Sequence, residues 1–222
     1  MTLLHTLIGD VVGSRAIQER GRFQQRLTAV LGEVTDELRP VQPLEATVGD
    51  EFQGAFATAA DATVAALLVR LALLPDVDVR CGLGYGVVTV HDAGRSPLLQ
   101  DGPGWWAARD ALEVLAQPRR AAQRTWYVGP GAGRVNAFLL TRDALVDRLG
   151  ERGWRLLAAA LTGATQTELA AAEGISKSAV SQQFARGVGA VRDAQRSFAT
   201  DIEEDRREPG DGGPVVGRGR RR

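Results

Sequence analysis

Residues 47–56 read T-V-G-D-E-F-Q-G-A-F and place two adjacent acids, Asp50 and Glu51, in a run that is otherwise apolar and β-prone. Short β-prone runs lie on both sides of the Gly-Asp pair. Glycine followed by aspartate suits a tight hairpin turn whose first central residue has a positive φ, because glycine adopts that conformation readily. The stretch therefore predicts an antiparallel hairpin with the two acids at its tip.

The segments around this hairpin alternate between strand and helix patterns. Residues 3–12 form a buried apolar run, and residues 16–38 and 59–74 both carry apolar side chains at helical spacing. A β-prone run with three glycines follows over residues 77–90. With the hairpin between the two helices, the order is β-α-β-β-α-β. This order is typical of a ferredoxin-like α+β fold, in which an antiparallel sheet carries two helices on one face.

The remainder of the chain is mainly helical. The pattern predicts a loop, a helix, a short strand and a second helix, over residues 91–104, 105–117, 125–128 and 136–149. From about residue 150 the composition becomes alanine-rich. We therefore expect an α+β domain over 1–149, a small all-α domain over 150–204 and a disordered basic tail over 205–222.

Composition excludes several classes of protein. The 222 residues carry 27 basic and 27 acidic side chains, so the net charge gives no general attraction to polyanions or membranes. Cys81 is the only cysteine, and the two histidines lie far apart without partner cysteines, which argues against disulfides and zinc sites. No stretch approaches the ~20 apolar residues of a membrane span, and the N-terminus lacks the basic region of a signal peptide. We expect a cytoplasmic protein.

Three carboxylates are expected to meet at one end of the sheet. Asp10 ends the first strand, and in the β-α-β-β-α-β order this strand end lies beside the hairpin tip with Asp50 and Glu51. Like charges placed together repel each other, and Mg²⁺ or Mn²⁺ bound through carboxylate oxygens would remove that repulsion. The alternative is that these acids serve only as turn and strand-end residues.

The turn after Asp10 offers groups that suit a phosphate. Gly13 and Ser14 break the strand before the first helix, and backbone N–H groups at a helix start bind anions. Arg15 is close enough in sequence to reach the same anion. The pattern predicts a metal–nucleotide site in which Gly13, Ser14 and Arg15 contact the nucleotide.

Four blocks of this sequence together resemble the bacterial SatD family. They are I-G-D-V-V-G-S-R, T-V-G-D-E-F-Q-G-A-F, V-R-C-G-L-G-Y-G-V-V-T-V and D-G-P-G-W-W-A-A-R-D-A-L. The same blocks resemble, more distantly, the palm-like catalytic domain of class III nucleotidyl cyclases. That resemblance implies that Asp10 and Asp50 are metal-binding aspartates and that Arg109 steadies phosphates in the transition state. Glu51 would match the acid of the related GGDEF diguanylate cyclases.

Two positions depart from the cyclase pattern. Ala46 stands where cyclases carry the lysine that reads adenine, and Trp105 stands where they carry an asparagine. These departures argue against ordinary cyclase activity and favour a nucleotide- or metal-binding sensor, or an enzyme with a different base or reaction. Trp105 and Trp106 suit stacking on a nucleotide base, and the alternative is that one lies in the core and one at the surface. Alternating glycines at 82, 84 and 86 are expected to let a helix pack closely.

Residues 165–186, T-Q-T-E-L-A-A-A-E-G-I-S-K-S-A-V-S-Q-Q-F-A-R, carry the pattern of a helix-turn-helix and resemble sigma region 4. Thr165 and Glu168 form a capping box for a first short helix, Gly174 takes the turn, and Ser176 caps a second helix. In this motif the second helix enters the DNA major groove with its N-terminal residues at the bases. The expected DNA-contacting residues are Gln166, Ser176, Lys177, Ser178, Ser181 and Gln182.

Two functional hypotheses follow. The first is a DNA-binding regulator whose N-terminal domain binds a metal and a nucleotide. Because the helical segment is only modestly basic, a single copy would bind DNA weakly, and a homodimer is expected. The second is a nucleotidyl or phosphoryl transfer enzyme whose C-terminal helices serve for docking or dimerisation. A palm domain that acts only as a scaffold is a further alternative.

Overall fold

The computed structural model describes the backbone of residues 1–47 and 49–207 and side chains as far as Thr200. The strands are β1 (Thr2–Val11), β2 (Gln42–Ala46), β3 (Phe52–Phe56), β4 (Val79–Asp92), β5 (Leu99–Asp101) and β6 (Thr125–Val128). The helices are α1 (Arg20–Leu38), α2 (Ala59–Leu73), α3 (Pro103–Ala116), α4 (Ala132–Val146), α5 (Glu151–Leu161), α6 (Gln166–Ala172), α7 (Lys177–Gln183) and α8 (Gly189–Arg207).

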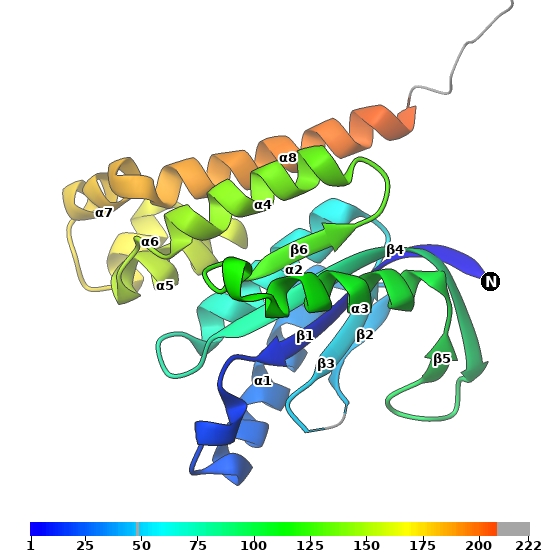
Figure 1. Cartoon of the computed structure of the whole chain (residues 1–222). Helices are drawn as coiled ribbons and strands as arrows, with labels where there is room; N and C mark the ends of the chain where they lie inside the picture. Colours follow the sequence, from blue (N-terminus) through cyan, green and yellow to red (C-terminus); the bar gives the residue numbers. More distant parts are fainter. Residues whose placement is uncertain (48, 208–222) are drawn as a thin grey trace, which may run out of the picture.

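The first six long elements follow the predicted β-α-β-β-α-β order. The sheet order is β2-β3-β1-β4-β5, and β6 pairs with β4 (Figure 1). β6 runs parallel to β4, whereas the other neighbouring strands are antiparallel. The predicted mixed α+β architecture is therefore confirmed, and β1 lies at the centre of the sheet, where both of its edges are paired.

Three local predictions need correction. The first helix begins at Arg20 rather than at residue 16, because residues 14–16 form a 3₁₀ turn. Strand β5 lies within the stretch predicted as a loop, where it pairs with the far end of β4. Helix α4 starts at Ala132, four residues before the predicted start, and ends at Val146.

The hairpin between β2 and β3 has the predicted positive φ at Gly49, but its closing hydrogen bond joins Thr47 to Glu51 and so spans three residues rather than two. Gly49 adopts a φ of 72°, and the backbone N–H of Thr47 donates to the carbonyl of Glu51 at 2.9 Å. Val48 lies outside the described residues. A positive φ is strained for residues with a Cβ, so Gly49 lets the chain reverse just before β3 begins at Phe52.

Each face of the sheet has its own apolar core. Leu7 of β1 and Leu83 of β4 pack with α1 residues such as Leu27 on one face. Leu4 and Ile8 of β1 pack with α3 on the opposite face. Successive side chains of a strand point to opposite faces, so the nearly uninterrupted apolar run of β1 reflects burial on both sides.

Helix α3 lies directly on the glycines of β4, as the alternating pattern predicts. A Cβ added at Gly84 would stand 2.4 Å from both Ala108 N and Gly104 O. Gly82 and Gly86 meet the backbone of the same helix. The absence of side chains at these positions thus sets the distance between α3 and the sheet, and with it the position of the residues on the exposed side of α3.

Helices α5 to α8 begin at Glu151 and pack on α2 and α4. Leu67 and Leu71 of α2 share an apolar cluster with Leu156 and Leu157 of α5 and Val180 of α7. Helix α8 runs alongside α4 (Figure 1), and the Phe138 and Phe198 rings stack there at 4.6 Å. Helix α8 continues to Arg207, and the rest of the predicted tail lies outside the described residues. Within the described part of the chain, no helix has the length and apolar character needed to cross a bilayer.

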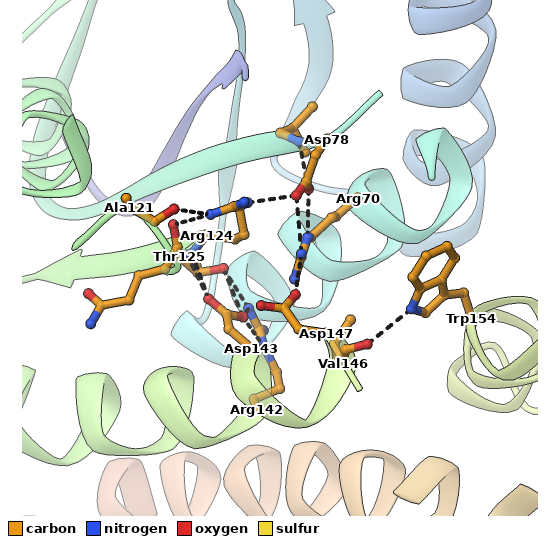
Figure 2. Close-up of polar contacts among 12 residues, drawn as sticks. Arg70, Asp78, Ala121, Arg124, Thr125, Arg142, Asp143, Val146, Asp147 and Trp154 are labelled. Carbon is orange, nitrogen blue, oxygen red and sulfur yellow. Dashed lines mark hydrogen bonds and ion pairs between the residues drawn. The ribbon is translucent and has the colours of Figure 1, made fainter. Parts of the chain in front are cut away.

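Buried charges join α4 to the sheet and to α2 (Figure 2). Arg70 of α2 donates from Nε to Asp78 Oδ1 at 2.7 Å and also pairs with Asp147 at the end of α4. Arg124 Nε donates to the other oxygen of Asp78 at 2.6 Å. Burial alone would raise the pKa of Asp78, but the bonds and charges of Arg70 and Arg124 hold it below its usual value.

Candidate functional site

The C-terminal end of β1 presents Asp10 next to an arginine of β4. Asp10 and Arg80 are directly opposite each other in the β1–β4 ladder. Arg80 donates from Nε to Asp10 Oδ1 at 3.1 Å and from Nη2 to Oδ2 at 2.6 Å. The two side chains are 24% and 26% exposed, so this two-point ion pair is within reach of solvent. The carboxylate predicted to bind a metal is already paired with a cation of the same sheet.

Glu51 makes a second pair of the same kind, with Arg109 of α3. The Nη1 and Nη2 atoms of Arg109 lie 2.8 and 2.9 Å from the two carboxylate oxygens of Glu51. Hydrogen bonding to Glu51 raises the pKa of Arg109, against a smaller opposing effect of burial, and the charge of Asp10 adds to the increase. The two ion pairs are neighbours, because the pairing of Gly9 with Phe52 in the β1–β3 ladder places Asp10 beside Glu51.

Two of the three carboxylates predicted to bind a metal are paired with arginines. Among the described residues, no group of three or more His, Cys, Asp or Glu side chains is arranged to hold a metal ion. The prediction rested on repulsion between Asp10, Asp50 and Glu51 that only a cation could relieve. Arg80 and Arg109 relieve it instead, because each forms a two-point ion pair with one of the acids. The residues present therefore do not fit Mg²⁺ or Mn²⁺ in this arrangement.

Asp50 points to a different part of the surface. It lines a small pocket, of about 20 Å³, between the hairpin and the start of α1; the other lining residues are Ser14, Ile17, Arg20, Phe23, Gln24 and Gly49. Gln24 Nε2 donates to the carbonyl of Gly49 and holds the turn against the helix. A volume of this size admits about one water molecule, so the pocket as it stands holds no nucleotide.

The predicted phosphate loop is only partly assembled. Gly13 takes a left-handed conformation, with a φ of 70°, and Ser14 begins the 3₁₀ turn. Ser14 lines the pocket with Asp50, whereas the side chain of Arg15 is exposed to solvent. Because α1 starts only at Arg20, the helix N-terminus that was expected beside Gly13 lies further along the chain.

The adjacent tryptophans are divided between core and surface. Trp105 is 7% exposed and packs with Leu4 and Leu112 between α3 and the sheet. It therefore offers no open face to a nucleotide base, and its assignment as a nucleotide contact is corrected. Trp106 is 57% exposed, and its Nε1 donates to Asp101 at 2.7 Å.

The predicted DNA-contacting residues lie on α6, α7 and the turn between them. Thr165 and Glu168 form the predicted capping box, and Gly174 takes the turn with a φ of 62°. The six predicted contacts, Gln166, Ser176, Lys177, Ser178, Ser181 and Gln182, are all exposed. On the inner side, Leu169 and Val180 are buried against the neighbouring helices.

The sequence pattern does not assign a role to Arg80, nor to the buried arginines of Figure 2. A signal for Arg80 was present, because alternation along 77–90 puts it on the same sheet face as the three glycines that contact α3. Antiparallel pairing with β1 then brings it to Asp10. Arg70 could have been noticed as the single charge in the otherwise apolar second half of α2, where an unpaired cation would be costly.

The chain was compared with protein families, curated proteins and solved structures. The model of the SatD family matches residues 4–124. A search of curated proteins finds no match. Among solved structures, the guanylyl cyclase Cya2 is similar at 15% identity and a TM-score of 0.41, over 49% of this chain and 68% of that one. A bacterial light-regulated adenylyl cyclase is similar at 14% identity and a TM-score of 0.43, over 62% of this chain and 81% of its own. The adenylyl cyclase CyaB from P. aeruginosa has 17% identity and a TM-score of 0.36, over 50% and 71%.

Proposed function

This chain belongs to the SatD family, and we propose that it is a regulatory protein that binds DNA through α6 and α7. The observation that carries the proposal is the division of this helix pair into two sides. The six polar residues expected to contact DNA are exposed, whereas Leu169 and Val180 anchor the opposite side in an apolar cluster. A short helix whose apolar side is packed against the protein and whose polar side is exposed to solvent suits insertion into a major groove.

The polar side chains of α7 suit different parts of a DNA site. Ser176 Oγ accepts from the backbone N–H of Ala179 at 3.2 Å, so its hydroxyl mainly caps the helix. Lys177, Ser181 and Gln182 make no side-chain hydrogen bond to the described residues and are available for contacts. Glutamine suits the edge of adenine, and lysine suits phosphate or guanine. Base reading is therefore proposed for Gln182 and phosphate contact for Lys177.

The charges around the helix pair predict weak binding by one copy. Arg155 makes two hydrogen bonds to Glu173, and Arg152 lies 3.8 Å from the same carboxylate. These two arginines are thus partly neutralised. Lys177 and Arg186 have no ion-pair partner within the described residues. With few free cations per copy, we propose that a homodimer binds two half-sites, since doubling the contacts raises affinity without changing either interface.

The alternative, a nucleotidyl or phosphoryl transfer enzyme, has less support. Such chemistry with Asp10 and Glu51 as metal ligands would require both arginine pairs to open, and Trp105 occupies the core. The arrangement fits a domain that binds a ligand and regulates better than one poised for catalysis.

The experiment that tests the proposal starts from the full chain and a library of random duplex DNA. Repeated selection should enrich one sequence, and fluorescence anisotropy then gives its affinity at several salt concentrations. We expect the double variant Lys177→Ala with Gln182→Ala to lose at least tenfold in affinity, because each base or phosphate contact contributes about 1–3 kcal/mol.

A matched control removes one basic residue and one glutamine elsewhere. Arg95 and Gln25 are exposed and lie on the β4–β5 loop and on α1. The double variant Arg95→Ala with Gln25→Ala should bind as tightly as the wild type. Failure to enrich any sequence, or equal losses in the two double variants with circular dichroism unchanged, would count against the proposal.

A further inference from the structure

The chain changes direction between α7, which is proposed to read DNA, and α8. The two helices are joined by a single π-helical turn, η3 (Phe184–Val188), in which the backbone N–H of Gly189 donates to the carbonyl of Phe184. Within this turn Gly187 has a φ of 139° and a ψ of −25°, a conformation that residues with a Cβ rarely adopt. A glycine at this one position therefore sets the angle between α7 and α8.

Helix α8 is attached along its length to the domain that contains the sheet. Val191 is buried in the apolar cluster that α2 shares with α5. Gln195 is 2% exposed, and its Nε2 donates to Thr63 Oγ1 of α2 at 2.8 Å. Further along, the ring of Phe198 stacks on that of Phe138 in α4. Spacings of four and three residues place Val191, Gln195 and Phe198 on one side of α8, so its position is fixed by α2 and α4.

Helix α7 has few contacts of its own that hold its direction. Its seven residues bury one side chain, Val180, and a helix of this length is not stable by itself. Two more buried side chains, Phe184 and Val188, belong to η3. A Cβ at Gly187 would stand 3.3 Å from Leu149 Cδ2, so η3 is closely packed as well as kinked. The direction of α7 is therefore imposed by α8 through η3.

We propose that Gly187 and α8 are positioning elements, which hold α7 at one angle to the sheet domain and thereby fix the distance between the two half-sites that a dimer binds. Their role rests on the proposed function, because it concerns how α6 and α7 meet DNA. The recognition helices of a helix-turn-helix dimer lie about 34 Å apart, one turn of the duplex, and each base pair corresponds to about 3.4 Å and about 35°. A change in the angle of α7 is therefore detected as a change in the preferred spacing.

Two variants alter this link at different points. Gly187→Ala adds a Cβ at a positive φ and makes the observed kink unfavourable. The double variant Gln195→Ala with Phe198→Ala keeps the kink and removes two contacts of α8 with α2 and α4. Neither variant changes a side chain of α6 or α7, so both should bind a duplex with one half-site within threefold of the wild type. Circular dichroism establishes that each is folded.

The measurement is fluorescence anisotropy with the selected sequence as two half-sites, whose spacing is varied one base pair at a time. The wild type should bind its preferred spacing at least tenfold more tightly than spacings one or two base pairs longer or shorter. In both variants this preference should fall below threefold or move to another spacing. A merely structural role would weaken binding to one half-site and to every spacing alike, and that result would overturn the proposal.

Amide hydrogen exchange tests the same link without DNA. Exchange in α7 should be at least threefold faster in both variants, whereas α3, which packs on the opposite face of the sheet, should exchange unchanged. Gly131→Ala is the matched control, because Gly131 also has a positive φ, of 68°, but lies at the start of α4. It should keep the wild-type spacing and exchange. Unchanged exchange in α7, or the wild-type spacing preference retained in either folded variant, would overturn the proposal. A wild type that selects no DNA would refute the proposed function as well as this one.

Discussion

Arg142 offers a sharp test of how α4 is joined to the rest of the protein. Its side chain is 1% exposed, and Nη2 lies 3.0 Å from Asp143 Oδ1 and 2.6 Å from Thr125 Oγ1. Nη1 donates to the carbonyl of Thr63 in α2 at 2.8 Å. The substitution Arg142→Met keeps most of the length of the side chain and removes the charge. It leaves the carboxylate of Asp143, which is 2% exposed, without its cation.

The expected loss follows from what remains around Asp143. Removing one partner of a buried ion pair costs about 3–5 kcal/mol, because the other charge stays buried. The backbone N–H groups of Arg124 and Thr125 still donate to Asp143, at 3.1 and 2.8 Å. They compensate part of the charge, so we expect a loss near the lower end, about 3 kcal/mol. Urea unfolding followed by circular dichroism measures this loss as a lower midpoint at unchanged slope.

A second substitution decides whether the loss arises from the uncompensated charge. Adding Asp143→Asn to Arg142→Met should restore part of the stability, because no buried charge then remains. The substitution Arg22→Met, which removes an exposed pair with Glu19, should leave the unfolding midpoint nearly unchanged. A loss below about 1 kcal/mol for Arg142→Met, with no recovery in the double variant, would refute the reasoning, since that is the range of exposed pairs.

Three further predictions concern Gly84 in the sheet, the ion pairs of Asp78, and the N-terminal cap of α6. Gly84→Ala should lower the free energy of unfolding, measured in urea, by about 3 kcal/mol or prevent folding, because the added Cβ would meet the backbone of α3. The control Gly133→Ala, at a position with open space around it, should not destabilise the protein. Because the folded pKa of Asp78 is depressed, the stability it contributes is present above its unfolded pKa of about 3.9 and is lost as the pH falls through the folded value. Unfolding curves at successive pH values should therefore show a shallower acid decline in Asp78→Asn; an unchanged slope contradicts this. Thr165→Ala should cost about 1 kcal/mol and speed amide exchange in α6, and unaltered exchange would mean that the cap is dispensable.

Local patterns predicted the elements of this fold better than they predicted the partners of its charges. The Gly-Asp turn and the helix caps depend on residues adjacent in sequence, so Gly49 and Thr165 could be interpreted directly. The glycines of β4 also reveal their role through spacing. Whether Asp10 meets a metal or Arg80 depends on strand register, which the first strand alone does not specify.

The burial of Trp105 likewise could not be predicted from the sequence. Both alternatives for Trp105 and Trp106 were visible in the sequence, but only the placement of α3 on the sheet decides which ring is buried. Arg142 gives no sequence signal at all, because an Arg-Asp pair in a helix is usually exposed to water. Its guanidinium group is enclosed by Thr63 of α2, Thr125 of β6 and Gln195 of α8, which lie far from it in sequence.

The contact between Thr63 and Gln195 has a consequence for how the protein folds while it is being synthesised. The two side chains are 132 positions apart in sequence, and Gln195 Nε2 donates to Thr63 Oγ1 at 2.8 Å in the interior. As the polypeptide leaves the ribosome, the strands that surround β1 emerge well before α8. Leu67 and Leu71 of α2 find their apolar partners only in the helices that follow residue 150, beginning with Leu156 and Leu157 of α5. While those helices are still being synthesised, the apolar side of α2 is exposed to solvent. Chaperones that bind exposed apolar segments would therefore be expected to bind α2 during this interval.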